Sequence, residues 1–116
     1  MRAEQHDRVL ARVRHRFAST LETKIKDSIA AIPVPGSEGN VIENIGDTYR
    51  RLHEISAVGS TVGFPATGQA ARAAEVIVLE ARLGGRSITP IEAASMRKAL
   101  AALWSAAQNE LRLMRM

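Results

Sequence analysis

The residue of this sequence best suited to chemistry is His53. It follows Leu52 in a stretch with helical period, so its side chain is turned about 100° from the apolar stripe that contains Leu52. The residues three, four and seven positions away share its side of the helix, and all but one of them are small. They are Gly46, Arg50, Ser56, Ala57 and Ser60. We therefore expect His53 to stand exposed above a low surface and close to a second helix.

An exposed imidazole of this kind suits phosphoryl transfer. Neutral imidazole, with a reference pKa of about 6.5, is a good nucleophile at neutral pH. The transition state of phosphoryl transfer mainly needs in-line positioning and charge neutralisation, so a carrier can offer one nucleophile while its partner supplies the remaining groups. A histidine with no second catalytic group beside it can thus still carry a phosphoryl group.

The other polar residues give little support to further chemistry. His6 and His15 lie among charged and polar residues of the first predicted helix and are expected to be solvated. Glu75 and Glu80 have the wrong spacing to share a helix face for acid–base catalysis. No histidine pair shares a helix turn with a carboxylate at metal-ligand spacing, and the sequence has no cysteine. We therefore expect no self-contained enzyme, no metal site and no bound cofactor.

Helical periodicity predicts the elements that position His53. A first helix is expected from Asp7 to Ile32, where the prolines and glycine of residues 33–36 end it. Ser19 and Glu22 have capping-box spacing, which allows a break there and a short or kinked N-terminal helix. The apolar stripe of this helix consists of Leu10, Val13, Phe17, Leu21, Ile25, Ile29 and Ile32.

Three more helices follow. The second is expected from a cap at Asn40 to near Gly63, and the third from a cap at Thr67 to Leu83. The fourth begins at residues 89–92, where a threonine cap, a proline and a capping-box glutamate come in order. Its apolar stripe consists of Ile91, Ala94, Leu100, Leu103, Trp104, Ala107, Leu111 and Met114.

Four amphipathic helices with short connections predict an all-α fold, an antiparallel four-helix bundle that forms a single domain over residues 1–116. The third helix is so apolar that it needs more than one neighbour, either within the bundle or across a dimer. The sequence contains no apolar run of the roughly 20 residues that span a bilayer and no signal-peptide core, so a cytoplasmic protein is expected.

The net charge of +4 is concentrated near the N-terminus, where Arg8, Arg12, Arg14 and Arg16 form a basic stripe. No nucleic-acid recognition motif and no interleaved aromatic residues accompany it. We therefore interpret the stripe as a solvated helix face and do not expect nucleic acid to be a partner.

The stretch from His53 to Phe64 resembles the signature of histidine-containing phosphotransfer (HPt) domains. That signature has a histidine, usually a lysine three residues on, a glycine four residues on, small residues beyond, and a glycine ten residues on. His53 and Gly63 match it, and residues 59–61 keep the small character. The resemblance implies a phosphorylated distal imidazole nitrogen and a phosphorelay role. It also implies partners that are response-regulator receiver domains or a hybrid sensor kinase, with Mg²⁺ held by the receiver.

Two positions depart from that signature. Ser56 stands in place of the usual lysine, and Ala57 in place of the usual glycine. The missing lysine removes a cation that would stabilise the incoming phosphate. Arg50, one turn earlier on the same face, is the replacement that the sequence suggests.

The sequence therefore predicts a phosphorelay intermediate. A receiver domain would dock over the face that contains Gly46, Arg50, His53, Ala57 and Ser60. Two alternatives remain open: a docking module of the same fold that has lost transfer, and a helical protein that binds nucleic acid through its basic stripe.

Overall fold

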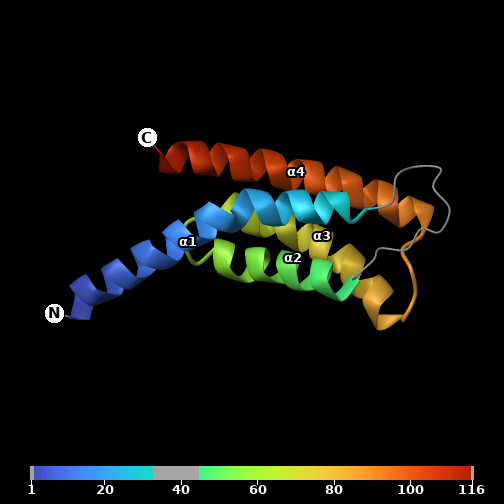
Figure 1. Ribbon diagram of the computed structural model, residues 1–116, viewed down its shortest axis with the longest axis horizontal. Helices are drawn as coiled ribbons and strands as arrows, with labels where there is room; N and C mark the ends of the chain where they lie inside the picture. Colours follow the sequence, from blue (N-terminus) through green and yellow to red (C-terminus); the bar gives the residue numbers. More distant parts are fainter. Residues whose placement is uncertain (1, 33–44, 116) are drawn as a thin grey trace.

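The computed structural model describes residues 2–32 and 45–115. Those residues form four α-helices, α1 (Arg2–Ala30), α2 (Ile45–Gly59), α3 (Pro65–Leu83) and α4 (Pro90–Met114), and no strand. Successive helices run in opposite directions, and α1 and α3 each pack against both α2 and α4 (Figure 1). The structure thus confirms the predicted all-α, antiparallel four-helix bundle.

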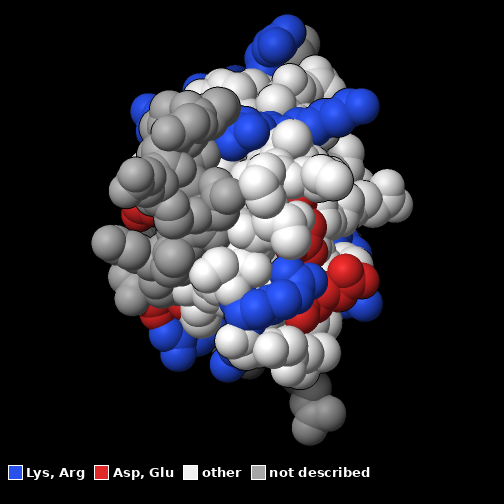
Figure 2. Space-filling model, turned by 90° about the vertical axis from the view of Figure 1, so that its right-hand side faces the viewer, with Lys and Arg blue, Asp and Glu red and all other residues white. Residues whose placement is uncertain are grey.

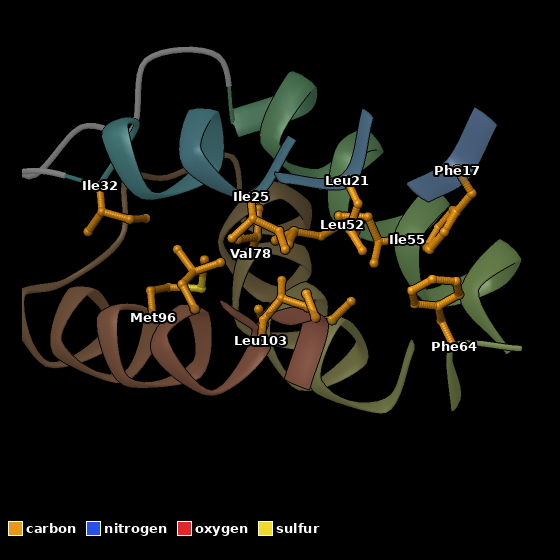
Figure 3. Packing of buried hydrophobic residues seen from close by; sticks show 14 of the residues in the cluster. Phe17, Leu21, Ile25, Ile32, Leu52, Ile55, Phe64, Val78, Met96 and Leu103 are labelled. Carbon is orange, nitrogen blue, oxygen red and sulfur yellow. The ribbon is translucent and has the colours of Figure 1, made fainter. Parts of the chain in front are cut away.

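The core lies along the centre of the bundle and is mainly aliphatic. Leu21 and Ile25 of α1, Leu52 and Ile55 of α2, and Leu103 of α4 are fully enclosed and face one another (Figure 3). Burial of each such side chain contributes about 1.5–3 kcal/mol relative to leaving it in water. The helix α3 adds mostly alanines to this core, so its backbone can approach both neighbours closely.

The break allowed at Ser19 does not occur, because α1 is one continuous helix of 29 residues. The Ser19 hydroxyl donates a hydrogen bond to the carbonyl oxygen of Arg16 at 2.9 Å. A serine bonded back to the preceding turn does not cap a new helix. The correct reading of this segment is therefore a single long helix whose first turns extend beyond the other three (Figure 1).

The apolar stripe of α1 is narrower than the sequence predicted. Phe17, Leu21, Ile25 and Ile32 are buried, but Val13 and Ile29 are 41% and 43% exposed. Val13 lies in the N-terminal half of the helix. Near the other end, the helix turns Ser28 into the core in place of Ile29. The Ser28 hydroxyl can be buried there because it donates to the carbonyl oxygen of Lys24 at 2.9 Å.

The end of α2 differs from the prediction, whereas its predicted cap is not tested by the structure. Asn40 lies outside the described residues, and α2 ends at Gly59 rather than near Gly63. Gly63 instead takes a φ of 91° in the turn that follows, a conformation that suits glycine. The Nε of Arg14 on α1 donates to the carbonyl oxygen of Val62 in the same turn at 2.6 Å, so one arginine of the basic stripe ties α1 to the end of α2.

The sequence suggested that Thr67 caps α3, but Thr67 lies inside the helix, which begins at Pro65. The cap comes from another helix. Glu110 of α4 accepts hydrogen bonds from the backbone N–H of Thr67 at 2.6 Å and from its hydroxyl at 2.7 Å. A carboxylate at a helix N-terminus satisfies free N–H groups and interacts favourably with the helix dipole.

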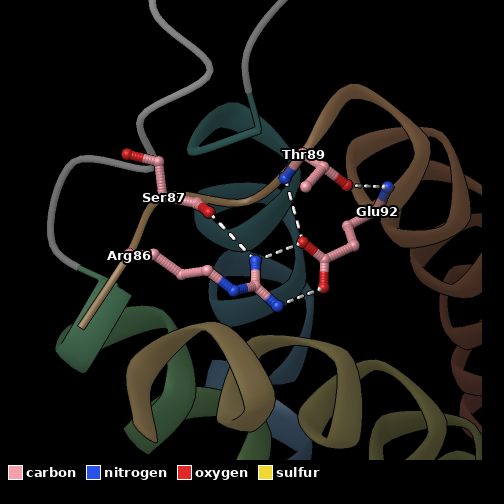
Figure 4. A network of polar contacts seen from close by, with 4 residues as sticks. All are labelled: Arg86, Ser87, Thr89 and Glu92. Carbon is pink, nitrogen blue, oxygen red and sulfur yellow. Dashed lines mark hydrogen bonds and ion pairs between the residues drawn. The ribbon is translucent and has the colours of Figure 1, made fainter. Parts of the chain in front are cut away.

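The predicted start of α4 is confirmed. Thr89 and Glu92 form a capping box, and the Arg86 guanidinium binds both carboxylate oxygens of Glu92, at 2.6 and 3.1 Å (Figure 4). The hydrogen bonds from Arg86 and from the Thr89 backbone hold the pKa of Glu92 at about 2, below its usual 4.5. Acidic and basic side chains lie next to one another on this end of the molecule (Figure 2).

The predicted register of α4 is correct from Leu100 to Leu111 but not at either end of the helix, and the predicted core residue Met114 is 41% exposed. Ile91 is 80% exposed and Ala94 is also exposed, whereas Ala93 and Met96 are buried. The capping box fixes the direction in which the first turn faces, and that direction places Ala93 rather than Ala94 on the core side. None of the four helices, over their described residues, has the length and apolar character needed to cross a membrane.

Candidate functional site

His53 lies in the middle of α2, on the side that faces α3. Its neighbour Leu52 is completely buried, while the His53 side chain is 54% exposed. The arrangement follows from the helical period, since adjacent residues point about 100° apart. His53 therefore has the exposure and the neighbouring helix that a nucleophile attacking a group on another protein requires.

The proximal ring nitrogen of His53 is held by a carboxylate from α3. Nδ1 of His53 and Oε1 of Glu75 are 2.5 Å apart, and the Glu75 side chain is only 3% exposed. An ionised carboxylate can only accept, so the hydrogen in this bond belongs to Nδ1. In the neutral ring the lone pair is then on Nε2, the distal nitrogen, which is the form that a nucleophilic imidazole needs.

A second contact fixes the plane of the imidazole ring. Tyr49, one helical turn before His53, stacks on it with ring centroids 5.6 Å apart and an angle of 18° between the planes. The guanidinium of Arg82 on α3 lies over the Tyr49 ring, 4.8 Å from its centroid. Stacking and cation–π contacts of this kind reduce the freedom of the histidine without using either ring nitrogen.

An open hollow of about 430 Å³ lies beside His53, between α2 and α3. We call it the His53 hollow. Its lining residues are mostly small or uncharged, and they are His53, Ser56, Ala57, Ser60, Gly68, Gln69 and Arg72. The hollow thus combines the exposed imidazole with hydroxyl, amide and guanidinium groups.

The helices α2 and α3 approach each other closely near Gly68, one of the lining residues. A Cβ atom at Gly59 would lie 3.2 Å from the carbonyl oxygen of Phe64 and 3.3 Å from the backbone of Gly68. A Cβ atom at Gly68 would lie 2.8 Å from the hydroxyl oxygen of Ser60. Glycine at both positions therefore lets α2 and α3 approach each other closely at this point.

The structure brings together only some of the residues predicted for the site. Ser56, Ala57 and Ser60 line the His53 hollow with His53 itself, but the other three predicted residues do not. Gly46 lines a separate depression near Arg82 and Arg86, and Arg50 forms an ion pair with Asp47. Gly63 lies in the turn after α2, beside Arg14.

Sequence reasoning missed the contribution of α3. Gln69, Arg72 and Glu75 come from one face of that helix, at steps of three residues, and all three adjoin His53 or its hollow. The available signal was a glutamate within the most apolar stretch of the sequence, since an acidic residue among alanines and valines needs a partner. The sequence pattern relates Glu75 only to residues of its own helix, such as Glu80, so its pairing with His53 was not predicted.

Arg72 adds a positive charge to the His53 hollow. Its side chain is 68% exposed, and its Nη1 lies 3.5 Å from Oε2 of Glu75. That oxygen is buried and has no hydrogen-bond partner. The two oxygens of this carboxylate are therefore engaged unequally: Oε1 is bound tightly to the Nδ1–H group of His53, and Oε2 is only loosely paired with Arg72.

Among residues 2–32 and 45–115, no group of three potential ligand side chains is arranged to hold a metal ion. No protein-family model matches the chain, and neither a curated protein nor a solved structure matches it.

Proposed function

We propose that this protein is a phosphorelay intermediate that carries a phosphoryl group on His53 and exchanges it with receiver domains of response regulators. The observation that supports this most strongly is the 2.5 Å contact between Nδ1 of His53 and the buried carboxylate of Glu75. This contact selects the tautomer with a free Nε2 and orients the ring, while the imidazole remains accessible to another protein.

The proposed step uses the lone pair of Nε2. It forms a bond to the phosphorus of a phosphoaspartate, and the bond between phosphorus and the aspartyl oxygen breaks. The electron pair of that bond leaves with the aspartate carboxylate. The ring keeps its hydrogen on Nδ1 and gains positive charge, which the Glu75 carboxylate offsets from 2.5 Å. Transfer to a second receiver follows the same steps in reverse.

The site fits a carrier better than an enzyme that works alone. It offers one nucleophile, one orienting carboxylate and an open hollow, and the groups that would activate a phosphoaspartate are left to the partner. The Mg²⁺ of the reaction would be held by the receiver. The small side chains of Ala57 and Ser60 leave room for a second protein to bring its phosphorylated residue close to His53.

Intact mass after incubation with phosphoramidate tests the proposal. The native protein is expected to gain one acid-labile phosphoryl adduct, which His53→Gln abolishes. His15→Gln is the matched control, because His15 is an exposed histidine of α1. Transfer from phosphorylated receiver domains to the native protein is measured next. If phosphoramidate and the receivers both leave the native protein unmodified, transfer is contradicted and the docking module without transfer becomes the better explanation.

A further inference from the structure

We infer that Arg72 of α3, and not Arg50 of α2, is the cation that binds the phosphoryl group carried on His53. This inference rests on the proposed function and adds to it the residue that takes over from the missing lysine. Ser56 occupies the position where that lysine is expected and contributes a hydroxyl without charge. A phosphoryl group brings about two negative charges at neutral pH, so the site needs a cation from elsewhere.

Arg50 is poorly placed for this task. It lies one turn before His53, its side chain is 70% exposed, and its guanidinium is ion-paired with Asp47 on the same helix. It does not line the His53 hollow. Its charge is thus largely offset by its own neighbour, outside the space in which a phosphoryl group on His53 would lie.

Arg72 is better placed. It lines the same hollow as His53, and it approaches from the opposite helix, so its guanidinium can reach a group attached to the imidazole from the other side. Its existing contact is weak, because 3.5 Å between Nη1 and Oε2 of Glu75 is longer than a normal hydrogen bond. A guanidinium binds phosphate oxygens through two parallel hydrogen bonds, which are shorter and stronger than this contact.

Movement of Arg72 to the phosphoryl group also has an effect on Glu75. The carboxylate now divides its charge between His53 and Arg72. Once Arg72 binds phosphate oxygens, that charge is left to the Nδ1–H group of the phosphorylated ring. Arg72 therefore changes its partner from Glu75 to the phosphoryl group while Glu75 stays with His53, and both contacts favour the phosphorylated state. Gln69 and Ser60, which also line the hollow, add donors that are uncharged.

The experiment compares native protein, Arg72→Ala and Arg50→Ala. Both variants remove one exposed arginine from the neighbourhood of His53, so they lose the same charge. The initial rate of phosphoramidate labelling should fall about tenfold in Arg72→Ala, because one hydrogen-bonding cation is lost from an exposed site. In Arg50→Ala the rate should change less than twofold. Arg72→Lys is expected to recover part of the rate. Circular dichroism melting curves check that each variant is folded.

A second readout reports contact rather than fold. The ³¹P NMR shift of the phosphorylated protein is followed against pH, and its midpoint is expected to rise in Arg72→Ala and to stay unchanged in Arg50→Ala. A cation bound to the phosphoryl oxygens favours their ionised form, so its removal moves the midpoint upward. Equal rates and equal midpoints in native protein and Arg72→Ala would overturn the inference, as would a larger effect in Arg50→Ala. Failure of the native protein to accept a phosphoryl group from both phosphoramidate and phosphorylated receivers contradicts the proposed function itself.

Discussion

Replacement of Glu75 is the most informative change that the structure suggests. In Glu75→Gln the side chain keeps its shape and an amide oxygen can still accept from Nδ1 of His53, but the negative charge is lost. In Glu75→Ala the acceptor is lost entirely. The two variants therefore separate the charge of the residue from its role in orienting the ring.

The magnitudes follow from the geometry of the contact. A hydrogen bond to a charged group contributes about 1.5–3 kcal/mol and one between neutral groups about 0.5–1.5 kcal/mol. The carboxylate is almost completely buried and 2.5 Å from Nδ1, so little water competes for it. Loss of the charge should then cost about 1 kcal/mol in the transition state, or about fivefold in rate. Loss of the whole contact should cost about 2 kcal/mol, or about thirtyfold.

The assay is the initial rate of His53 labelling by phosphoramidate, measured by intact mass at neutral pH. Thermal melting is measured alongside it, because an Oε2 atom without a hydrogen bond already destabilises the folded state. Glu75→Gln is expected to remain folded at the assay temperature while it labels more slowly. Labelling at the native rate by folded Glu75→Ala would refute the argument that Glu75 prepares His53.

Two further predictions concern stability. Gly59→Ala should destabilise the bundle by about 1–3 kcal/mol in chemical denaturation, because its Cβ would press on the backbone of α3. Gly46→Ala should stabilise it by about 0.5–1 kcal/mol, because no atom lies within 4 Å of the added Cβ. Equal effects of the two substitutions would contradict the close approach of α2 and α3. Glu92→Gln should lower the free energy of unfolding at pH 7 but leave it near the native value at about pH 2. The pKa of Glu92 is lowered on folding. Its carboxylate therefore stabilises the folded state fully above pH 4.5, and this stabilisation disappears as the pH falls through about 2. A difference between the two proteins that is independent of pH would contradict this assignment.

Features that depend on neighbouring residues could be predicted from the sequence. The start of α4 is determined by four consecutive residues, and the positions of Leu52 and His53 follow from the helical period alone. The bundle itself follows from four amphipathic segments with short connections. The first two predictions succeeded because the interactions involved lie within one or two turns of the same helix. The bundle could be predicted because each amphipathic helix must bury its apolar stripe, whichever helix covers it.

Features that depend on contacts between helices could not be predicted in this way. The partner of His53 is 22 residues away, and the group that caps α3 is 43 residues from Thr67. Glu110 makes Thr67 an interior residue of the helix, although its type and spacing favour a cap. Likewise, Arg50 and Arg72 both look like free cations in the sequence, and only their distances to Asp47 and Glu75 distinguish them. Such pairings are set by packing, which helical period does not encode.

The cap on α3 has a consequence for the order in which the site can be assembled. Glu110 of α4 holds the first turn of the helix that supplies Gln69, Arg72 and Glu75 to His53. On the ribosome, α2 and α3 emerge before Glu110, the residue that caps the first turn of α3. The pair can form contacts early, but the first turn of α3 lacks its carboxylate until residue 110 has left the exit tunnel. The arrangement of side chains around His53 is therefore complete only once the fourth helix has packed against α3.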